Sequence, residues 1–161
     1  MLARYARGPV MAKKTEEYSA SERAAAPARI LIVEDNQFNR LLIHDVLELR
    51  GHTICEAATV EEARRALASF RPDLLLLDVQ IPGGGGEAVI REVRRRGDMD
   101  HLPIIAVTSL AMPGDRERLL SIGFQGYLSK PIDTRTFGAA IESYLDPEHS
   151  NREKQSVRNI G

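Results

Sequence analysis

The feature that most constrains the fold is a regular alternation of short apolar runs with longer segments of helical character. Five runs predict strands: RILIVED (29–35), HTICEA (52–57), DLLLLD (73–78), PIIAVTS (103–109) and GYLSK (126–130). The segments that follow them predict helices over 36–51, 59–70, 87–96, 114–123 and 133–145. Five strands alternating with five helices indicate an α/β fold, a doubly wound parallel sheet with helices on both faces.

Local signals support these assignments. DLLLLD is the most continuous apolar run, as expected of a central strand that is buried on both faces. Thr59 followed by Glu62 is the pattern of a capping box, in which each residue caps the start of the helix that follows. Gly51 comes directly after the first helical segment and is typical of a helix C-terminus.

The expected domain covers residues 29–145 of the 161-residue chain. Residues 1–28 are rich in Ala, Ser and charged side chains, and 146–161 open with Asp-Pro and are polar throughout. Such compositions bury too little apolar surface to order themselves, so both segments are predicted to be flexible tails. Neither contains a DNA-binding or enzymatic output domain, so we expect a stand-alone domain.

Composition excludes several classes of partner. The formal net charge is −1, which gives no electrostatic footprint for nucleic acid or an anionic membrane. No apolar stretch approaches the roughly 20 residues needed to span a bilayer. The single cysteine, Cys55, fits a reducing compartment, and the N-terminus lacks a secretory apolar segment. We therefore expect a cytoplasmic protein.

Chemically active side chains collect at the predicted strand ends, which is where ligands bind in doubly wound sheets. These residues are Glu34 and Asp35, Asp78, Thr108 and Lys130, from four different strands. Converging carboxylates repel one another, and a hard divalent cation such as Mg²⁺ relieves that repulsion. An aspartate so placed can attack a phosphoryl group, and a lysine can hold phosphoryl oxygens. Any one residue alone is better explained as a loop cap or a neutralising charge. Their joint placement favours a site.

Four segments carry a resemblance to a known family: ILIVEDN, DLLLLDVQIP, AVTSLAMPGDRE and GFQGYLSKPI. They resemble the signature segments of the response-regulator receiver domain of two-component signalling. The resemblance covers essentially all of 29–145 and implies the flavodoxin-like receiver fold. It also implies that Asp78 accepts a phosphoryl group from a phosphohistidine, on a histidine kinase or a histidine phosphotransfer protein.

The same resemblance implies roles for the neighbouring residues. Glu34, Asp35 and Asp78 would hold Mg²⁺ together with the backbone carbonyl of Gln80. Thr108 and Lys130 would contact the phosphoryl oxygens, and the Lys130–Pro131 bond would be cis. Tyr127 would report the state of Thr108, so this pair would form the switch. The protein would then be a signalling protein that assists its own phosphorylation and dephosphorylation.

Four glycines at 83–86 follow Asp78 closely and first suggest a phosphate-binding loop. A Walker-type loop needs a lysine directly after its last glycine, and here Gly86 is followed by Glu87. The glycines are therefore interpreted as a turn, with the aspartate handling phosphate. In the receiver pattern Gly86 matches the customary glycine. We expect Gly86 alone to need a backbone conformation closed to other residues, and Gly83–Gly85 to be the most mobile loop of this edge.

Four alternatives bear on function. A haloacid-dehalogenase-like phosphatase also uses a strand-end aspartate with Mg²⁺, but it needs a second aspartate where this chain has Gln80. An unphosphorylated pseudo-receiver normally lacks one of the acids or the lysine, and none is missing. Two readings of the receiver stay open, a regulator of an unknown protein target and a shuttle to a histidine phosphotransfer protein. A phosphorylation-dependent homodimer is a further candidate.

Four histidines, His44, His52, His101 and His149, are scattered without the spacing of metal ligands. They are therefore predicted to lie at the surface or at edges. Cys55 falls in a predicted strand and is interpreted as a small core residue.

Overall fold

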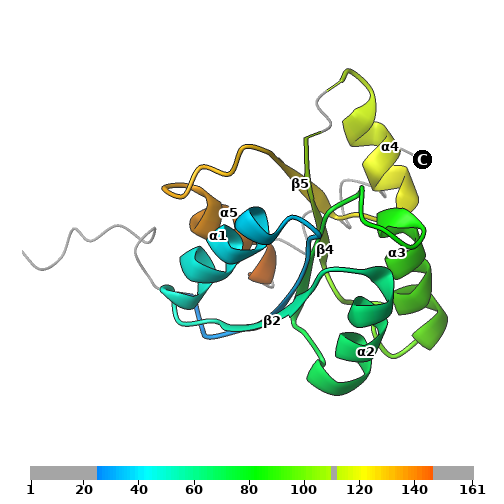
Figure 1. Cartoon of the computed structure of the whole chain (residues 1–161), viewed down its shortest axis with the longest axis horizontal. Helices are drawn as coiled ribbons and strands as arrows, with labels where there is room; N and C mark the ends of the chain where they lie inside the picture. The colour runs from blue at the N-terminus through cyan, green and yellow to red at the C-terminus, as the bar shows by residue number, and fades with distance from the viewer. Residues whose placement is uncertain (1–24, 110–111, 147–161) are drawn as a thin grey trace, which may run out of the picture.

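The computed structural model describes residues 25–109 and 112–146 and has the predicted architecture of a five-stranded parallel sheet between helices (Figure 1). The strands are β1 (Arg29–Val33), β2 (Thr53–Ala57), β3 (Leu74–Leu77), β4 (Ile104–Thr108) and β5 (Gly126–Ser129). The helices are α1 (Gln37–Glu48), α2 (Val60–Phe70), α3 (Gly85–Arg96), α4 (Asp115–Ile122) and α5 (Phe137–Leu145). The strand order is β2-β1-β3-β4-β5. The flexible tails predicted over 1–28 and 146–161 lie almost entirely outside the described residues.

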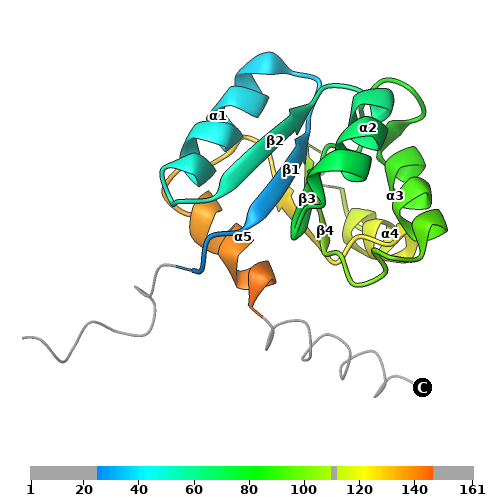
Figure 2. The same ribbon diagram turned by 90° about the horizontal axis from the view of Figure 1, so that it is seen from below.

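The sheet separates two layers of helices. Helices α1 and α5 cover one face, and α2, α3 and α4 cover the other (Figures 1 and 2). Each layer has its own apolar core, one built around Ile43 and Leu47 of α1 with Phe137 and Ile141 of α5. The other core is built around α2, α3 and α4. Among the described residues, no helix is long and apolar enough to cross a membrane.

The central strands are the most deeply buried. All four leucines of β3 are at most 1% exposed, because one pair faces each helical layer. This explains the unbroken apolar run in the sequence, since a strand covered on both faces has no polar side. Strand β1 pairs with β2 on one side and β3 on the other, which places the acids that follow β1 beside the end of β3.

Helix starts follow local capping. Thr59 Oγ1 accepts a hydrogen bond from the backbone N–H of Glu62 at 3.2 Å, and the Glu62 carboxylate accepts one from Ala58 N at 2.7 Å. The Thr59 half of the predicted capping box is therefore present, whereas Glu62 bonds the N–H of Ala58, one residue before the cap, and not that of Thr59. Asn36 caps α1 in the same manner, because its side chain accepts the backbone N–H of Asn39 at 3.0 Å.

The start of α5 differs from the prediction. It begins at Phe137 and not at residue 133, because Asp133 forms a turn of its own. The Asp133 side chain accepts the backbone N–H of Arg135 at 3.0 Å, and its carbonyl accepts the N–H of Thr136 and Phe137. An aspartate that bonds the backbone two residues later favours such a turn over a helix.

The glycine loop also differs from the prediction. Gly83, Gly84 and Gly85 have φ of 95°, 108° and 71°, whereas Gly86 is not among the residues with positive φ. The prediction that Gly86 alone needs a restricted backbone conformation is therefore wrong. Helix α3 begins at Gly85, two residues earlier than predicted. The N–H groups of Gly85 and Gly86 bond the carbonyls of Ile81 and Val79, so the chain reverses sharply.

Gly86 is required for a different reason, which is lack of space. A Cβ at this position would lie 3.1 Å from the carbonyl oxygen of Asp78 and 3.2 Å from Cα of Val79. The helix start is thus pressed against the backbone that carries Asp78. The three preceding glycines supply left-handed turns that other residues adopt only with strain. The prediction that Gly83–Gly85 are unusually mobile stays a prediction.

Candidate functional site

Backbone pairing continues one residue past the strands and aligns the candidate residues. The N–H of Glu34 donates to the carbonyl of Ala57 at 3.0 Å, and the N–H of Asp78 donates to Val33 at 2.9 Å. The N–H of Lys130 donates to the carbonyl of Thr108 at 2.9 Å. Because the strands are parallel, all these residues lie at the carboxyl edge of the sheet, as the sequence predicts.

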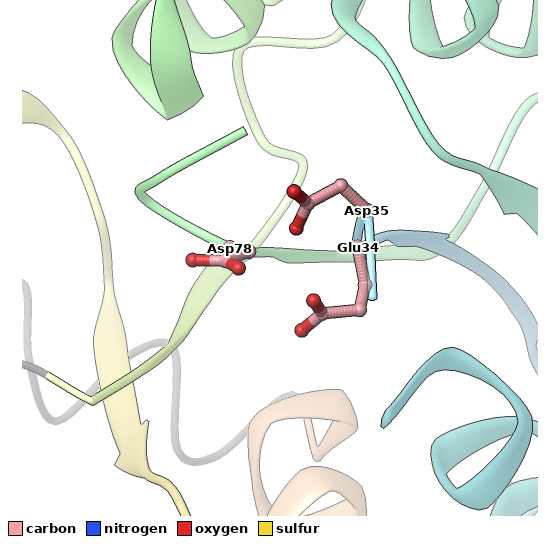
Figure 3. Close-up of side chains that lie close together, drawn as sticks. All are labelled: Glu34, Asp35 and Asp78. Carbon is pink, nitrogen blue, oxygen red and sulfur yellow. The ribbon is translucent and has the colours of Figure 1, made fainter. Parts of the chain in front are cut away.

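Three carboxylates come together at this edge. Glu34, Asp35 and Asp78 each offer an oxygen, and these oxygens lie within 4.8 Å of one another. In the view of Figure 3 the side chains of Glu34 and Asp35 leave the end of β1 in different directions, and both carboxylates turn toward Asp78 at the end of β3. Glu34 and Asp78 are only 1% and 6% exposed, whereas Asp35 is exposed. The cluster therefore has two buried acids and one that faces solvent.

Lys130 lies against the two buried acids. Its Nζ is 2.6 Å from Oε2 of Glu34 and 3.0 Å from Oδ2 of Asp78. Both contacts are close ion pairs within hydrogen-bond distance. Burial disfavours the charged ammonium, but the hydrogen bonds and charges of Glu34 and Asp78 together raise the pKa of Lys130 above 10.5. Lys130 is therefore a fixed positive charge.

The remaining carboxylate oxygens are oriented by backbone N–H groups. Oδ1 of Asp78 accepts from the N–H of Gln80 at 2.9 Å, and Oε1 of Glu34 accepts from the N–H of Asn36 at 3.0 Å. The peptide bond between Lys130 and Pro131 is cis, as predicted. Each buried acid is thus held by a backbone N–H at one carboxylate oxygen and by Lys130 at the other.

The cluster keeps an excess of negative charge, since three carboxylates face one ammonium. Burial raises the pKa of Glu34 and outweighs the opposing effect of Lys130 and the Asn36 N–H, while the charge of Asp78 adds to the rise. Oε2 of Glu34 is fully buried, and the Lys130 ammonium lies against it. An all-oxygen donor set with unbalanced charge fits a hard divalent cation, so Glu34, Asp35 and Asp78 could hold one.

Two further predicted residues lie around this centre. Thr108 is completely buried at the end of β4, and the register pairs it with Ser129 of β5. Tyr127, also on β5, pairs with Ala106 and is 37% exposed. Tyr127 is therefore on β5, the strand that leads to Lys130, and Thr108 is on the neighbouring strand β4. The backbone N–H of Gln80 donates to Asp78, which places Gln80 beside the cluster. The role of its carbonyl as a metal ligand stays a prediction.

One neighbour of the acid pair was missed at the level of sequence. Arg40, in the first turns of α1, donates from Nη1 to the carbonyl oxygen of Glu34 at 2.8 Å. Its Nε donates to Oε2 of Glu56 on β2 at 3.1 Å. Arg40 lies five residues after Asp35, so its long side chain can reach back from the first turn of α1 to the loop that carries the acids. Its bond with Glu56 depends on how β2 pairs with β1.

His52 is the clearest correction among the histidines, since it is 4% exposed and not at the surface. Its Nδ1 accepts the backbone N–H of Ala28 at 3.1 Å, so the ring proton is on Nε2, which faces Oε1 of Glu142 at 3.1 Å. Arg50 holds both oxygens of Glu142 from Nε and Nη2, at 2.7 and 2.6 Å. A lone histidine before a strand gives no sign of this network, which requires α5 to be in place.

Comparison with known proteins decides the family. A profile of the response regulator receiver domain matches residues 30–142, which is well over half of the chain. The chain belongs to the response regulator receiver family. Receiver domains are signalling proteins, and this membership implies a phosphodonor partner such as a histidine kinase.

This receiver has similar relatives among curated proteins. It is 39% identical over 119 residues to the polar-differentiation response regulator DivK of Brucella anthropi, covering 74% of this chain and 97% of that protein. It is 38% identical over 116 residues to DivK of Brucella ovis, covering 72% and 94%. Nearly the whole of each relative is thus matched by the domain described above.

Solved receiver structures have the same fold. The chemotaxis protein CheY4 of Vibrio cholerae aligns with a TM-score of 0.69 at 25% identity, over 74% of this chain and 99% of that one. The receiver domain of a sensor histidine kinase from Pseudomonas aeruginosa aligns with a TM-score of 0.67 at 32% identity, over 74% and 98%. That second structure has a magnesium ion coordinated in its active-site cleft. The predicted flavodoxin-like receiver fold is confirmed.

Proposed function

We propose that this receiver accepts a phosphoryl group on Asp78 from a phosphohistidine and signals through the surface that phosphorylation changes. The observation that carries the proposal is the setting of Asp78. One of its oxygens bonds the Gln80 N–H and the other bonds Lys130, and two further acids lie beside it. A buried carboxylate held in this way is oriented for attack and is flanked by a cation that can bind the transferred group.

In the proposed reaction an oxygen of Asp78 attacks phosphorus, and the bond between phosphorus and the imidazole nitrogen breaks. The imidazole nitrogen retains the electron pair, and Asp78 becomes an acyl phosphate. Lys130 moves from its contact with Asp78 to a phosphoryl oxygen while staying against Glu34. The Thr108 hydroxyl donates to another phosphoryl oxygen. Glu34, Asp35, Asp78 and the Gln80 carbonyl would hold Mg²⁺, which would neutralise charge between the acids and the incoming group.

The test is phosphorylation with a small phosphodonor such as acetyl phosphate, followed by intact-protein mass spectrometry. Wild-type protein should gain one phosphoryl group in Mg²⁺ and none in chelator. Asp78→Asn should gain none, whereas Asp98→Asn, which removes an exposed acid that faces Arg71, should behave as wild type. Labelling of Asp78→Asn would overturn the proposal.

The proposed switch follows from the positions of Thr108 and Tyr127. Movement of the Thr108 hydroxyl toward the phosphoryl group leaves space that the half-exposed ring of Tyr127 fills, which alters the α4–β5–α5 surface. Thr108→Ala should still accept phosphate but lose phosphorylation-dependent binding to a protein target or to a second copy of the chain. Size-exclusion chromatography with light scattering measures the second case. Equal dimerisation of phosphorylated mutant and wild type would count against this switch.

The matched relatives bear the names of response regulators, which supports a regulator over a phosphorelay shuttle. The two differ in reversibility. A regulator should pass little phosphate from Asp78 back to a purified histidine phosphotransfer protein, and a shuttle should pass most of it. Rapid and complete back-transfer would replace the regulator with the shuttle.

A further inference from the structure

We infer that Arg40 is a positioning residue for the acid pair and sets the affinity of the site for its divalent cation. The inference rests on the proposed function and deepens it, because it names a side chain outside the cluster on which cation binding depends. Arg40 contacts the backbone of the two acids and none of the three carboxylates that form the cluster.

The loop that carries the acids is short and has few supports. The N–H of Glu34 is fixed by Ala57, but its carbonyl lies beyond the strand pairing and is held by Nη1 of Arg40 at 2.8 Å. The same nitrogen lies 3.4 Å from the carbonyl oxygen of Asp35. Arg40 therefore holds the backbone carbonyls of both residues of the acid pair.

Arg40 is itself held in place. Its Nε bonds Oε2 of Glu56 at 3.1 Å, and only 18% of its side chain is exposed. The other oxygen of Glu56 lies 2.5 Å from Nδ1 of His44, one turn further along α1. The guanidinium thus connects the loop to α1 and to the edge strand β2. A planar group with several fixed donors suits this task, because it can bond two partners in different directions at once.

The consequence concerns Asp35 above all. Glu34 has Lys130 and the Asn36 N–H to orient it, whereas Asp35 is exposed. The direction of its carboxylate thus depends on the backbone that Arg40 holds. Residues that orient metal ligands typically change metal affinity by about 10- to 100-fold when they are mutated.

Electrostatics alone predicts a change in Mg²⁺ affinity of the opposite sign, so one measurement distinguishes the two effects. A positive charge next to a cation site repels the cation, so removal of Arg40 by charge alone should strengthen Mg²⁺ binding. Removal of a positioning group should weaken it. The direction of the change therefore separates the two effects without any need to compare sizes.

The experiment is isothermal titration of Mg²⁺ into the wild-type chain and matched variants. Arg40→Gln should bind Mg²⁺ about tenfold more weakly. Arg40→Lys should recover only part of this loss, because one ammonium cannot bond Glu56 and the Glu34 carbonyl in the same geometry. Glu56→Gln should show a smaller loss in the same direction.

Two controls separate positioning from general loss of stability. Arg50→Gln breaks an arginine–glutamate pair at the other end of the sheet and should lower stability without a change in Mg²⁺ affinity. Arg71→Gln breaks an exposed surface pair with Asp98 and should change neither. The rate of phosphorylation of Arg40→Gln by acetyl phosphate should approach that of wild type once Mg²⁺ saturates, since only binding is impaired.

Equal or tighter Mg²⁺ binding by Arg40→Gln would overturn this inference and leave the proposed function standing. Absence of Mg²⁺ binding by the wild-type chain would overturn both. If Arg40→Gln fails to fold, Glu56→Gln carries the test, and wild-type affinity in that variant would overturn the inference.

Discussion

The two ends of the sheet each gather charged residues in a largely buried setting, but they differ in how well the charges are matched. At the amino end, Arg50 pairs with Glu142 through two hydrogen bonds, and neutral His52 uses both ring nitrogens. At the carboxyl end, three carboxylates share one ammonium. The first arrangement is complete in itself. The second has unbalanced charge that a bound cation could neutralise.

This difference teaches that buried charge has two uses in one small domain. A matched network stabilises the fold and gains nothing from a ligand. A mismatched cluster costs stability, and under the proposed function this cost is offset when a cation and a phosphoryl group bind, the usual relation between stability and function at a binding site. Mutations at the two ends should therefore respond differently to Mg²⁺, and four predictions test this.

The largest effect should come from Lys130→Met, which removes the cation between the two buried acids. We expect a loss of about 4 kcal/mol in the free energy of unfolding at neutral pH without metal, since two buried carboxylates are left uncompensated. Mg²⁺ should restore part of it. The pKa of Lys130 is raised above 10.5, so its contribution is complete below that pH and is lost as pH rises through the higher folded value.

Urea denaturation in chelator and in Mg²⁺ measures the change. Lys130→Met keeps the length of the side chain and removes its charge. Lys130→Arg keeps the charge, so it is the matched control and should lose less stability. A loss that Mg²⁺ leaves unaltered would break the comparison.

The next effect concerns the shape of the carboxyl end and not its charge. Replacing Gly84 and Gly85 with Met and Asp should lower stability by about 2–3 kcal/mol, because both positions have positive φ. A Cβ at Gly85 would also lie 3.1 Å from the carbonyl oxygen of Val79. Gly97→Ala is the control, since its φ is 70° in open surroundings and it should show the cost of φ alone.

Chemical denaturation compares the two variants. A Met-Asp variant as stable as wild type would show that the loop relaxes to another turn and that the glycines are dispensable.

A smaller effect is expected at the amino end. Glu142→Gln should cost about 1–2 kcal/mol at neutral pH, because it weakens the charge-assisted bonds to Arg50. Mg²⁺ should leave this loss unchanged. The hydrogen bond from Arg50, helped by that from His52 and opposed by burial, holds the pKa of Glu142 below its usual 4.5.

The sign of the pH dependence follows from that lowered pKa. The contribution of Glu142 is complete above about 4.5 and is lost as pH falls through the lower folded value, so the two proteins should converge in acid. Thermal unfolding from pH 7 downward measures this. A stability difference between Glu142→Gln and wild type that stays constant into strong acid would contradict the lowered pKa of Glu142.

The smallest effect should be a gain. Asp35→Asn should raise the free energy of unfolding in chelator by about 1 kcal/mol, because it removes an exposed charge that is repelled by Glu34 and Asp78. Added Mg²⁺ should stabilise wild type more than the variant and so close the gap. Asp98→Asn, which removes an exposed acid elsewhere, should show no gain. A loss of stability in Asp35→Asn without metal would show that the cluster is not in repulsion.

Sequence alone predicted the elements and the carboxyl-end cluster for one physical reason. Strand ends are visible as apolar runs, and parallel strands bring their ends together without any knowledge of packing. Asp78 and Lys130 are 52 residues apart in the chain and still meet at 3.0 Å. The acids that follow β1 were placed by the same argument.

The features that sequence missed depend on relations between elements. Arg40 reaches Glu56 only because β2 pairs with β1 in one register, and His52 is buried only because α5 brings Glu142 over it. The sequence shows four consecutive glycines but not their dihedral angles. The restricted backbone conformation was therefore predicted for Gly86, whereas Gly83–Gly85 have the positive φ. In each case the missing information is three-dimensional and local, and no periodicity encodes it.

The strand order gives the two kinds of charge in the site unequal protection. Strands β1 and β3, which carry the acids, are paired on both sides, whereas β5, which carries Lys130, is an edge strand paired only with β4. Edge elements open in partial unfolding events that leave the centre of a sheet intact, and amide hydrogen exchange detects such events. Opening at β5 withdraws the ammonium and leaves three carboxylates on a folded frame, so a cation bound there takes over the neutralising role of the ammonium and should make the edge strand easier to open.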